Sequence, residues 1–233
     1  MSLDVLLDVP QWVNIMGVLV GSIQGAMYAA GFRTQRLDLL GIALIGIATG
    51  LGGGFLRDIL LNRVPLALTV NYLILLAIAG AFIGMLLGRI IHANLDWLLS
   101  LLDAIALGTF AMIGTTAAIY ADLPFVPVIF VGVITAVGGG MLRDIMLNMP
   151  IAVMHVGSLY ATAALIGAFT LETLHTCGVP IDTAGLIGAA LTTIVRLLAR
   201  RYGWSLPEQR ILRSIRDPRL ATPDDLTGPI QKP

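Results

Sequence analysis

Apolar stretches of roughly 18 or more residues recur along the chain, and short segments that carry most of the charge separate them. A helix needs about 20 predominantly apolar residues to cross a hydrocarbon core about 30 Å thick. Helices of a soluble bundle keep a polar face, whereas the segment 73–87 has almost none. The pattern predicts an all-α, polytopic membrane protein. Its seven transmembrane helices are expected at 12–31, 38–62, 66–90, 98–119, 124–147, 152–173 and 181–199.

Composition supports a membrane protein and excludes several other classes. The chain has 57% hydrophobic and 12% charged residues, whereas soluble domains carry about 25% charged residues. Cys177 is the only cysteine, so neither a disulfide nor a thiolate metal cluster is expected. The net charge of zero argues against a nucleic-acid partner. The segment 1–10 lacks the basic start of a signal peptide, so we expect the first span to be retained, in the plasma membrane of a prokaryote.

Charges in the segments between the spans predict the orientation, because cytoplasmic loops are enriched in Lys and Arg. With a cytoplasmic C-terminus, the N-terminus lies outside and two groups of residues separate. The inner group is Arg33, Arg36, Arg89, His92, Arg196, Arg200 and Arg201, and the outer group is Asp122, Glu172 and Asp182.

The C-terminal part changes character after the last span. Residues 1–202 form the predicted transmembrane domain, and 203–233, which contains five prolines among polar residues, is a predicted cytoplasmic tail. The stretch 208–216 has isoleucine and leucine on one helical side and arginines around it. This pattern suits an anionic lipid surface, and it suits a short solvated helix equally well.

An internal repeat divides the transmembrane domain. When Gly52 is aligned with Gly138, the pairs Gly46/Gly132, Thr49/Thr135, Arg57/Arg143, Asp58/Asp144 and Asn62/Asn148 match. The repeats cover about 12–90 and 98–173, with three spans each. Because three is odd, the second repeat enters the membrane from the opposite side, and the seventh helix at 181–199 stands outside the symmetry.

A glycine triplet lies in the second and fifth predicted spans. Each glycine in a helix interior costs about 1 kcal/mol relative to alanine, and three in a row predict a kink near the middle of the membrane. Irregular backbone at that depth is tolerated where it is buried in protein or lines a water-filled cavity. Tight helix packing is the other explanation. The predicted pore or hinge residues are Thr49, Gly52, Gly53, Gly54, Thr135, Gly138, Gly139 and Gly140.

Charged residues follow both triplets within about one helical turn. Arg57 and Asp58, like Arg143 and Asp144, are adjacent, and adjacent helical residues point about 100° apart, so we expect poor neutralisation within each pair. Structural ion pairs and pore-lining groups are both open roles for them. Asp103 lies inside the fourth span and is expected to pair with an arginine or to attract cations at the cytoplasmic mouth.

No catalytic or metal-binding pattern emerges. Neither glycine triplet fits a dinucleotide-binding loop, because the first lacks the final glycine and the second begins with Ala136. The three histidines lack metal-ligand spacing, and no Ser-His-acid set is suggested. We therefore expect no enzyme, no cofactor and no bound metal.

The segments GGGFLRDILLNRVP and GGGMLRDIMLNMP, with LDAIALGTFAMIG ahead of the second, resemble the bacterial trimeric intracellular cation (TRIC) channel family. Related membrane proteins carry a "glycine transporter" domain label. The resemblance covers about 12–199 and implies seven helices, kinks at both triplets, a homotrimer and a potassium-conducting pore in each protomer. It also matches Asp103 to the acidic start of the fourth helix. The lysine-containing lipid-binding pattern of the animal members is absent, so phosphoinositide binding is not transferred.

Three functions remain open on the residues alone. A channel would use backbone carbonyls freed at the triplets to favour K+ or Na+. A carrier for glycine or another small amino acid would bind the substrate carboxylate at a half-helix amino end or at Arg57 or Arg143. A membrane scaffold would use the glycines for packing and gives the paired charges no role. The resemblance favours the channel.

Overall fold

The structure, a computed structural model, describes residues 10–32, 36–90, 95–154 and 159–205. All regular elements in these ranges are helical. They are α1 (Gln11–Gly31), α2 (Leu39–Leu60), the short α3 (Leu66–Thr69), α4 (Asn71–Ile90), α5 (Leu95–Tyr120), α6 (Phe125–Met146), the 3-10 turn η2 (Ala152–Met154), α7 (Tyr160–Thr176) and α8 (Ile181–Tyr202). The predicted positions of Arg33, His92 and His155 and the tail from 206 to 233 lie outside the described residues.

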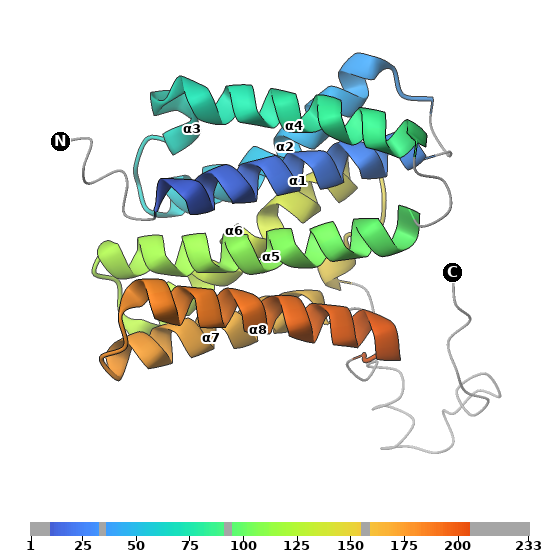
Figure 1. The fold of residues 1–233 in the computed structure, drawn as a ribbon. Coiled ribbons are helices and arrows are strands. Elements are labelled where there is room, and N and C mark those ends of the chain that lie inside the picture. The colour runs from blue at the N-terminus through green and yellow to red at the C-terminus, as the bar shows by residue number, and fades with distance from the viewer. Residues whose placement is uncertain (1–9, 33–35, 91–94, 155–158, 206–233) are drawn as a thin grey trace, which may run out of the picture.

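The long helices form a bundle of two layers (Figure 1). The helices α4, α1, α5 and α8 lie side by side in one layer, and α2, α6 and α7 form the layer behind it. Successive long helices run in alternating directions, so α1 begins at the end of the bundle where α5 ends. We name the end where α1, α4, α6 and α8 terminate the Arg196 end, and the opposite end the Arg57 end.

Among the described residues, six helices are long and apolar enough to cross a membrane: α1, α2, α4, α5, α6 and α8. The α7 helix has 17 residues, close to the lower limit of about 17 for a spanning helix. Large apolar side chains such as Leu40 and Val126 are 66% and 72% exposed on the outer surface of the bundle. This is the surface that a hydrocarbon solvent requires. The prediction of an all-helical membrane protein is confirmed.

Two predicted spans begin too early. The span expected at 66–90 is divided at Val70 into α3 and α4, and the helix expected from 152 begins only at Tyr160. In both places a buried aspartate accepts a hydrogen bond from the backbone of the connecting segment, at Leu66 and at Ala152. These bonds hold the connection against the preceding helix end, so the next long helix begins later.

Glu172 lies within the predicted span 152–173, close to its end. It is part of α7, four residues before the last residue of that helix, and is only 6% exposed. The helix continues past the predicted end of the span to Thr176.

The two halves of the bundle meet where α2 crosses α6, at the glycine triplets. A β-carbon at Gly53 would collide with the carbonyl oxygen of Thr135, and one at Gly139 with the carbonyl oxygen of Thr49. The contacts are reciprocal, since Gly52 faces Leu142 and Gly138 faces Leu56 in the same way. Small residues let helix backbones approach closely in lipid. Both triplets lie inside continuous helices, which extend beyond them at both ends.

The halves differ in how their outer helices pack. In the first half α4 lies directly on α1, and a β-carbon at Gly84 would meet the carbonyl oxygen of Ile23. In the second half α8 packs on both α5 and α7. Close contacts join Gly188 to Gly167 of α7, and Gly108 of α5 to the carbonyl of Ala189. The helix outside the repeat is therefore an integral part of the second half.

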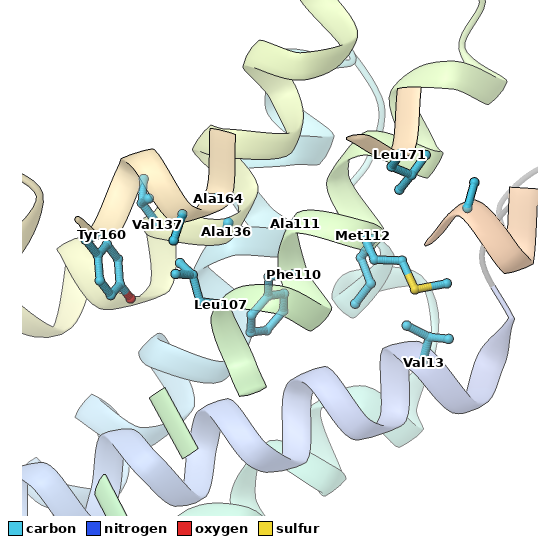
Figure 2. Close-up of a cluster of buried hydrophobic side chains, with 13 residues drawn as sticks. Val13, Leu107, Phe110, Ala111, Met112, Ala136, Val137, Tyr160, Ala164 and Leu171 are labelled. Atoms are coloured by element: carbon cyan, nitrogen blue, oxygen red, sulfur yellow. The ribbon is translucent and has the colours of Figure 1, made fainter. Parts of the chain in front are cut away.

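An apolar cluster fills the interior around α5 (Figure 2). It includes Leu107 and Phe110 of α5, Val13 of α1 and Leu171 of α7. Phe110 lies between α5 and α1, where a β-carbon at Gly21 would approach its ring to 3.1 Å. This contact packs the first helix of one half against the first helix of the other.

The crossing predicts a sharp difference between neighbouring glycines. We expect Gly53→Ala and Gly139→Ala to lower the melting temperature of the detergent-purified protein, because a backbone carbonyl blocks each new methyl group and overpacking costs about 1–3 kcal/mol. Gly54→Ala is the matched control, since no atom lies within 4 Å of its β-carbon position. Equal melting temperatures for all three variants would contradict the close crossing.

Candidate functional site

The Arg57–Asp58 pair of the first half lies in the last turn of α2. Arg57 donates from Nε to Asp58 Oδ1 at 2.8 Å and from Nη2 to Oδ2 at 3.0 Å. Asp58 also accepts from Arg63 Nε at 3.0 Å and from the backbone N–H of Leu66 at 2.8 Å. Asp58 is 1% exposed and Arg57 is 4% exposed. The carboxylate thus holds two arginines and the start of α3 together.

The pair of the second half repeats this geometry at the end of α6. Arg143 donates to Asp144 Oδ1 from Nε at 3.0 Å and from Nη2 at 2.8 Å. Asp144 Oδ2 accepts from the backbone N–H of Ala152 at 3.0 Å. Each helix then ends through an asparagine in the left-handed region, Asn62 with φ of 51° and Asn148 with φ of 52°, a conformation that asparagine tolerates well. The repeated Arg-Asp-x-x-x-Asn is therefore a helix-ending motif.

The expectation that adjacent arginine and aspartate would neutralise each other poorly is wrong. The 100° angle between adjacent positions separates Cβ directions but not the ends of long side chains. The arginine side chains bend toward the short aspartates, and both pairs close at 2.8 Å. Because the arginine and aspartate side chains are buried, water is not available as a partner, and this favours their pairing with each other.

A cavity of about 450 Å³ opens at the Arg196 end. Asp103 and Leu99 of α5 line it, together with Gln24 of α1, Arg143 of α6 and Arg196 of α8. Five further residues complete the lining: Tyr28, Asp96, Ala152, Tyr160 and Arg200. We call it the wide cavity. Its wall is mostly polar and charged, although it extends into a bundle of apolar helices.

Asp103 joins the elements around the wide cavity. Its Oδ2 accepts from Arg196 Nε at 3.3 Å and from Nη2 at 3.2 Å, and its Oδ1 lies 3.8 Å from Arg143 Nη1. The Tyr160 hydroxyl donates to the same Oδ1 at 3.4 Å. The expected pairing of Asp103 with an arginine is confirmed, and it connects α5 with α6, α7 and α8.

Two tyrosines complete the network. The Arg143 guanidinium lies 4.5 Å from the ring centroid of Tyr28, and that of Arg196 lies 4.6 Å from the ring centroid of Tyr160. Both distances suit cation–π attraction. Reading the sequence did not identify either tyrosine, and it assigned Arg196 only to the inner membrane boundary. Arg196 lies six residues before the end of α8, and this depth could have pointed to a buried partner.

A second, narrow cavity of about 20 Å³ lies toward the Arg57 end. Asn14 and Val18 of α1, Gly54 and Arg57 of α2, and Phe110 of α5 are among its lining residues. It occupies the place in the first half that the wide cavity occupies in the second. The two cavities thus lie toward opposite ends of the bundle, and the narrow one includes Gly54 next to the triplet crossing.

The predicted hinge residues separate into two groups. Gly52, Gly53, Gly138 and Gly139 form the crossing, whereas Gly54 faces the narrow cavity and Gly140 faces the Tyr160 hydroxyl. The hydroxyls of Thr49 and Thr135 donate to Ile45 O and Val131 O in their own helices, both at 2.7 Å. Within the described ranges, no group of three or more His, Cys, Asp or Glu residues could hold a metal ion.

Comparisons with known proteins agree with this geometry. A family model described as "Glycine transporter" matches residues 11–89 and 100–176. The UPF0126 inner membrane protein YadS of Escherichia coli K12 is 33% identical over 198 residues, covering 84% of this chain and 94% of its own length.

Solved structures resemble the chain over most of its length. One, from work on the structural basis for conductance through TRIC cation channels, is 34% identical with a TM-score of 0.75 and covers 86% of this chain and 97% of its own. Another, the TRIC trimeric intracellular cation channel orthologue from Rhodobacter sphaeroides, is 29% identical with a TM-score of 0.76 and covers 83% and 97%.

The aspartates that end α2 and α6 are expected to stabilise the fold strongly. Asp58→Asn leaves the buried Arg57 without its carboxylate partner, and breaking a buried ion pair in this way costs about 3–5 kcal/mol. Asp144→Asn should cost less, because Arg143 also lies 3.8 Å from Asp103. We expect the melting temperature of both variants to fall in detergent, with the larger fall for Asp58→Asn. Asp182→Asn, at an exposed position in α8, is the control and should melt like the parent. A parent-like Asp58→Asn variant would show that the carboxylate charge is dispensable.

Proposed function

Because the chain belongs to the glycine-transporter family, which includes the TRIC cation channels and the UPF0126 membrane proteins, we propose that it is a channel for monovalent cations. Potassium is the expected main ion, with Na+ as a second permeant ion. A pore runs through each protomer of a homotrimer in the membrane of a prokaryote. The name and fold of the Rhodobacter sphaeroides orthologue support the trimer.

The observation that carries the proposal is the pair of cavities that approach the triplet crossing from opposite ends. Gln24 lines the wide cavity and Val18 the narrow one. They are six positions apart on α1, which corresponds to about 9 Å along a helix. Phe110 fills part of this gap against Gly21. A pore that joins the cavities along α1 would have to pass this side chain.

The buried ion pairs argue against a carrier for an anionic substrate. The arginines that a carrier would offer to a substrate carboxylate, Arg57 and Arg143, already donate to Asp58 and Asp144. The negative ends of the helix dipoles of α2 and α6 point toward the narrow and the wide cavity respectively. These helix ends favour a cation, although three arginines line the wide cavity beside its two aspartates.

We infer further that all seven long helices span the membrane as two inverted repeats plus α8. The alternating helix directions and the reciprocal contacts of Gly53 and Gly139 support the inversion. The hinge role of the triplets stays part of this proposal: α2 and α6 would bend there when the pore opens. The positive-inside bias places the Arg196 end at the cytoplasm, with the N-terminus outside.

Purified protein in planar bilayers under a tenfold KCl gradient tests the function. We expect unitary current steps with a reversal potential near the potassium value, about 59 mV in magnitude. Bilayers treated with detergent alone serve as the control. Saturable counterflow of labelled glycine into proteoliposomes, without current steps, would overturn the channel in favour of a carrier.

Cys177 tests the orientation. It is exposed in the turn between α7 and α8, at the Arg57 end, and it is the only cysteine of the chain. We expect a membrane-impermeant maleimide to label it in spheroplasts, because the proposed topology places this turn outside. Cys177→Ser is the control for background labelling. Labelling that requires permeabilised membranes would reverse the orientation.

A further inference from the structure

One polar side chain that lines the narrow cavity takes no part in an ion pair. The polar lining residues are Asn14, Arg57 and Asp58, and the last two bind each other. The Asn14 amide has no hydrogen-bond partner among the described residues, although Asn14 is only 6% exposed. A buried amide without a partner is costly unless something in the cavity binds it. We therefore expect a ligand of the narrow cavity to contact Asn14.

Asn14 occupies the place in the first half that Asp103 occupies in the second. A β-carbon at Gly25 of α1 or at Gly114 of α5 would meet the hydroxyl of the matched threonine of the repeat, in α2 or α6 respectively. The two glycines are therefore equivalent. Asn14 precedes Gly25 by eleven residues, as Asp103 precedes Gly114. The first half thus carries a neutral amide where the second half carries a carboxylate.

The seventh long helix explains this difference. Asp103 accepts from Arg196 of α8 at 3.2 Å, and α8 has no counterpart in the first half. A carboxylate at the place of Asn14 would lack that cation, and an incompletely paired buried charge is costly. The amide avoids this cost. It also leaves the narrow cavity with a neutral oxygen that no arginine occupies.

The narrow cavity is too small for a hydrated ion. Its volume is about 20 Å³, and a single water molecule needs about 10–15 Å³. A potassium ion is about as large as a water molecule, so it fits only after it has lost most of its hydration water. Protein oxygens replace such water in cation channels. The amide oxygen of Asn14 is an unoccupied oxygen of this kind.

We propose that Asn14 determines the cation affinity of the narrow cavity: its amide oxygen replaces one hydration water of the monovalent cation that passes. This inference rests on the proposed channel function and names the side chain that the ion contacts at the Arg57 end. Because the amide is neutral, the ion binds weakly enough to leave again, as conduction requires.

Two substitutions of Asn14 change this affinity in opposite directions. Asn14→Leu keeps the shape and removes the oxygen, so we expect the KCl concentration that half-saturates the unitary conductance to rise about tenfold, the factor for one bond to a charged group. Asn14→Asp adds a charge, so this concentration should fall about threefold. Arg57 lines the same cavity and would lie near the new carboxylate, as Arg143 lies near Asp103.

A matched control separates ion contact from packing. Thr109→Val also removes a polar group from the bundle interior, but its hydroxyl donates to Ile105 O in its own helix and it lines neither cavity. Its half-saturating KCl concentration should equal that of the parent. A packing effect would move both Asn14 variants in the same direction. Such a result, or parent-like values in both variants, would overturn the role of Asn14.

A thiol at the same place tests ion access directly. Asn14→Cys is made in the Cys177→Ser background, which otherwise contains no cysteine. Ag+, a monovalent cation similar in size to K+, displaces the thiol proton and stays bound to the sulfur. We expect Ag+ added at the Arg57 end to block the current of this variant irreversibly and to leave Cys177→Ser unaffected. Unchanged current in both proteins would overturn the contact.

The same recordings separate this inference from the proposed function. Current steps in the parent protein, with unchanged half-saturation in both Asn14 variants, would reject the role of Asn14 and leave the channel standing. A parent protein without current would reject the channel, and the role of Asn14 with it. Melting temperatures in detergent show that each variant is folded before its current is compared.

Discussion

A carboxylate buried at the end of a membrane helix must have all its hydrogen bonds satisfied within the protein, and this constraint shapes both halves of the bundle. Asp58 and Asp144 meet it by accepting from the preceding arginine and from a backbone N–H eight residues further on. The same bonds end the helix, hold the connecting segment and delay the next helix. Removing the charge of Asp58 would leave Arg57 buried without its carboxylate, which costs more than the pair contributes when intact, whereas Arg143 would keep Asp103 at 3.8 Å.

The three glycines of each triplet make two kinds of contact, and Asp58 and Asp144 hold the helix ends next to them. The first two glycines of each triplet allow α2 and α6 to cross in close contact, so the halves meet without an apolar side chain between them. The third faces the narrow cavity in α2 and the Tyr160 hydroxyl in α6. Asp58 and Asp144 hold the ends of α2 and α6 about one turn after the triplets. The residues at the crossing can therefore be glycines while the helix ends stay in place.

Hydropathy and the repeat were enough to predict the class of fold, six of the spans and the equivalence of the triplets. The motif also pointed to Arg57, Asp58, Arg143 and Asp144, but not to their pairing, because side-chain reach is not a function of helical angle alone. Tyr160 was not predicted, and Arg196 was predicted only at the inner membrane boundary, because Arg196 comes from α8, which stands outside the repeat. Their meeting depends on the packing of α8, which no local pattern encodes.

The position of α8 has a consequence for how the protein is made. The first half can pack α4 directly onto α1 as soon as both are in the membrane, with no later segment required. In the second half, the surface of α5 and α7 that α8 covers stays unpaired until α8 has been synthesised and has entered the bilayer. The ion pair of Asp103 with Arg196 therefore cannot form before the last long helix has been synthesised.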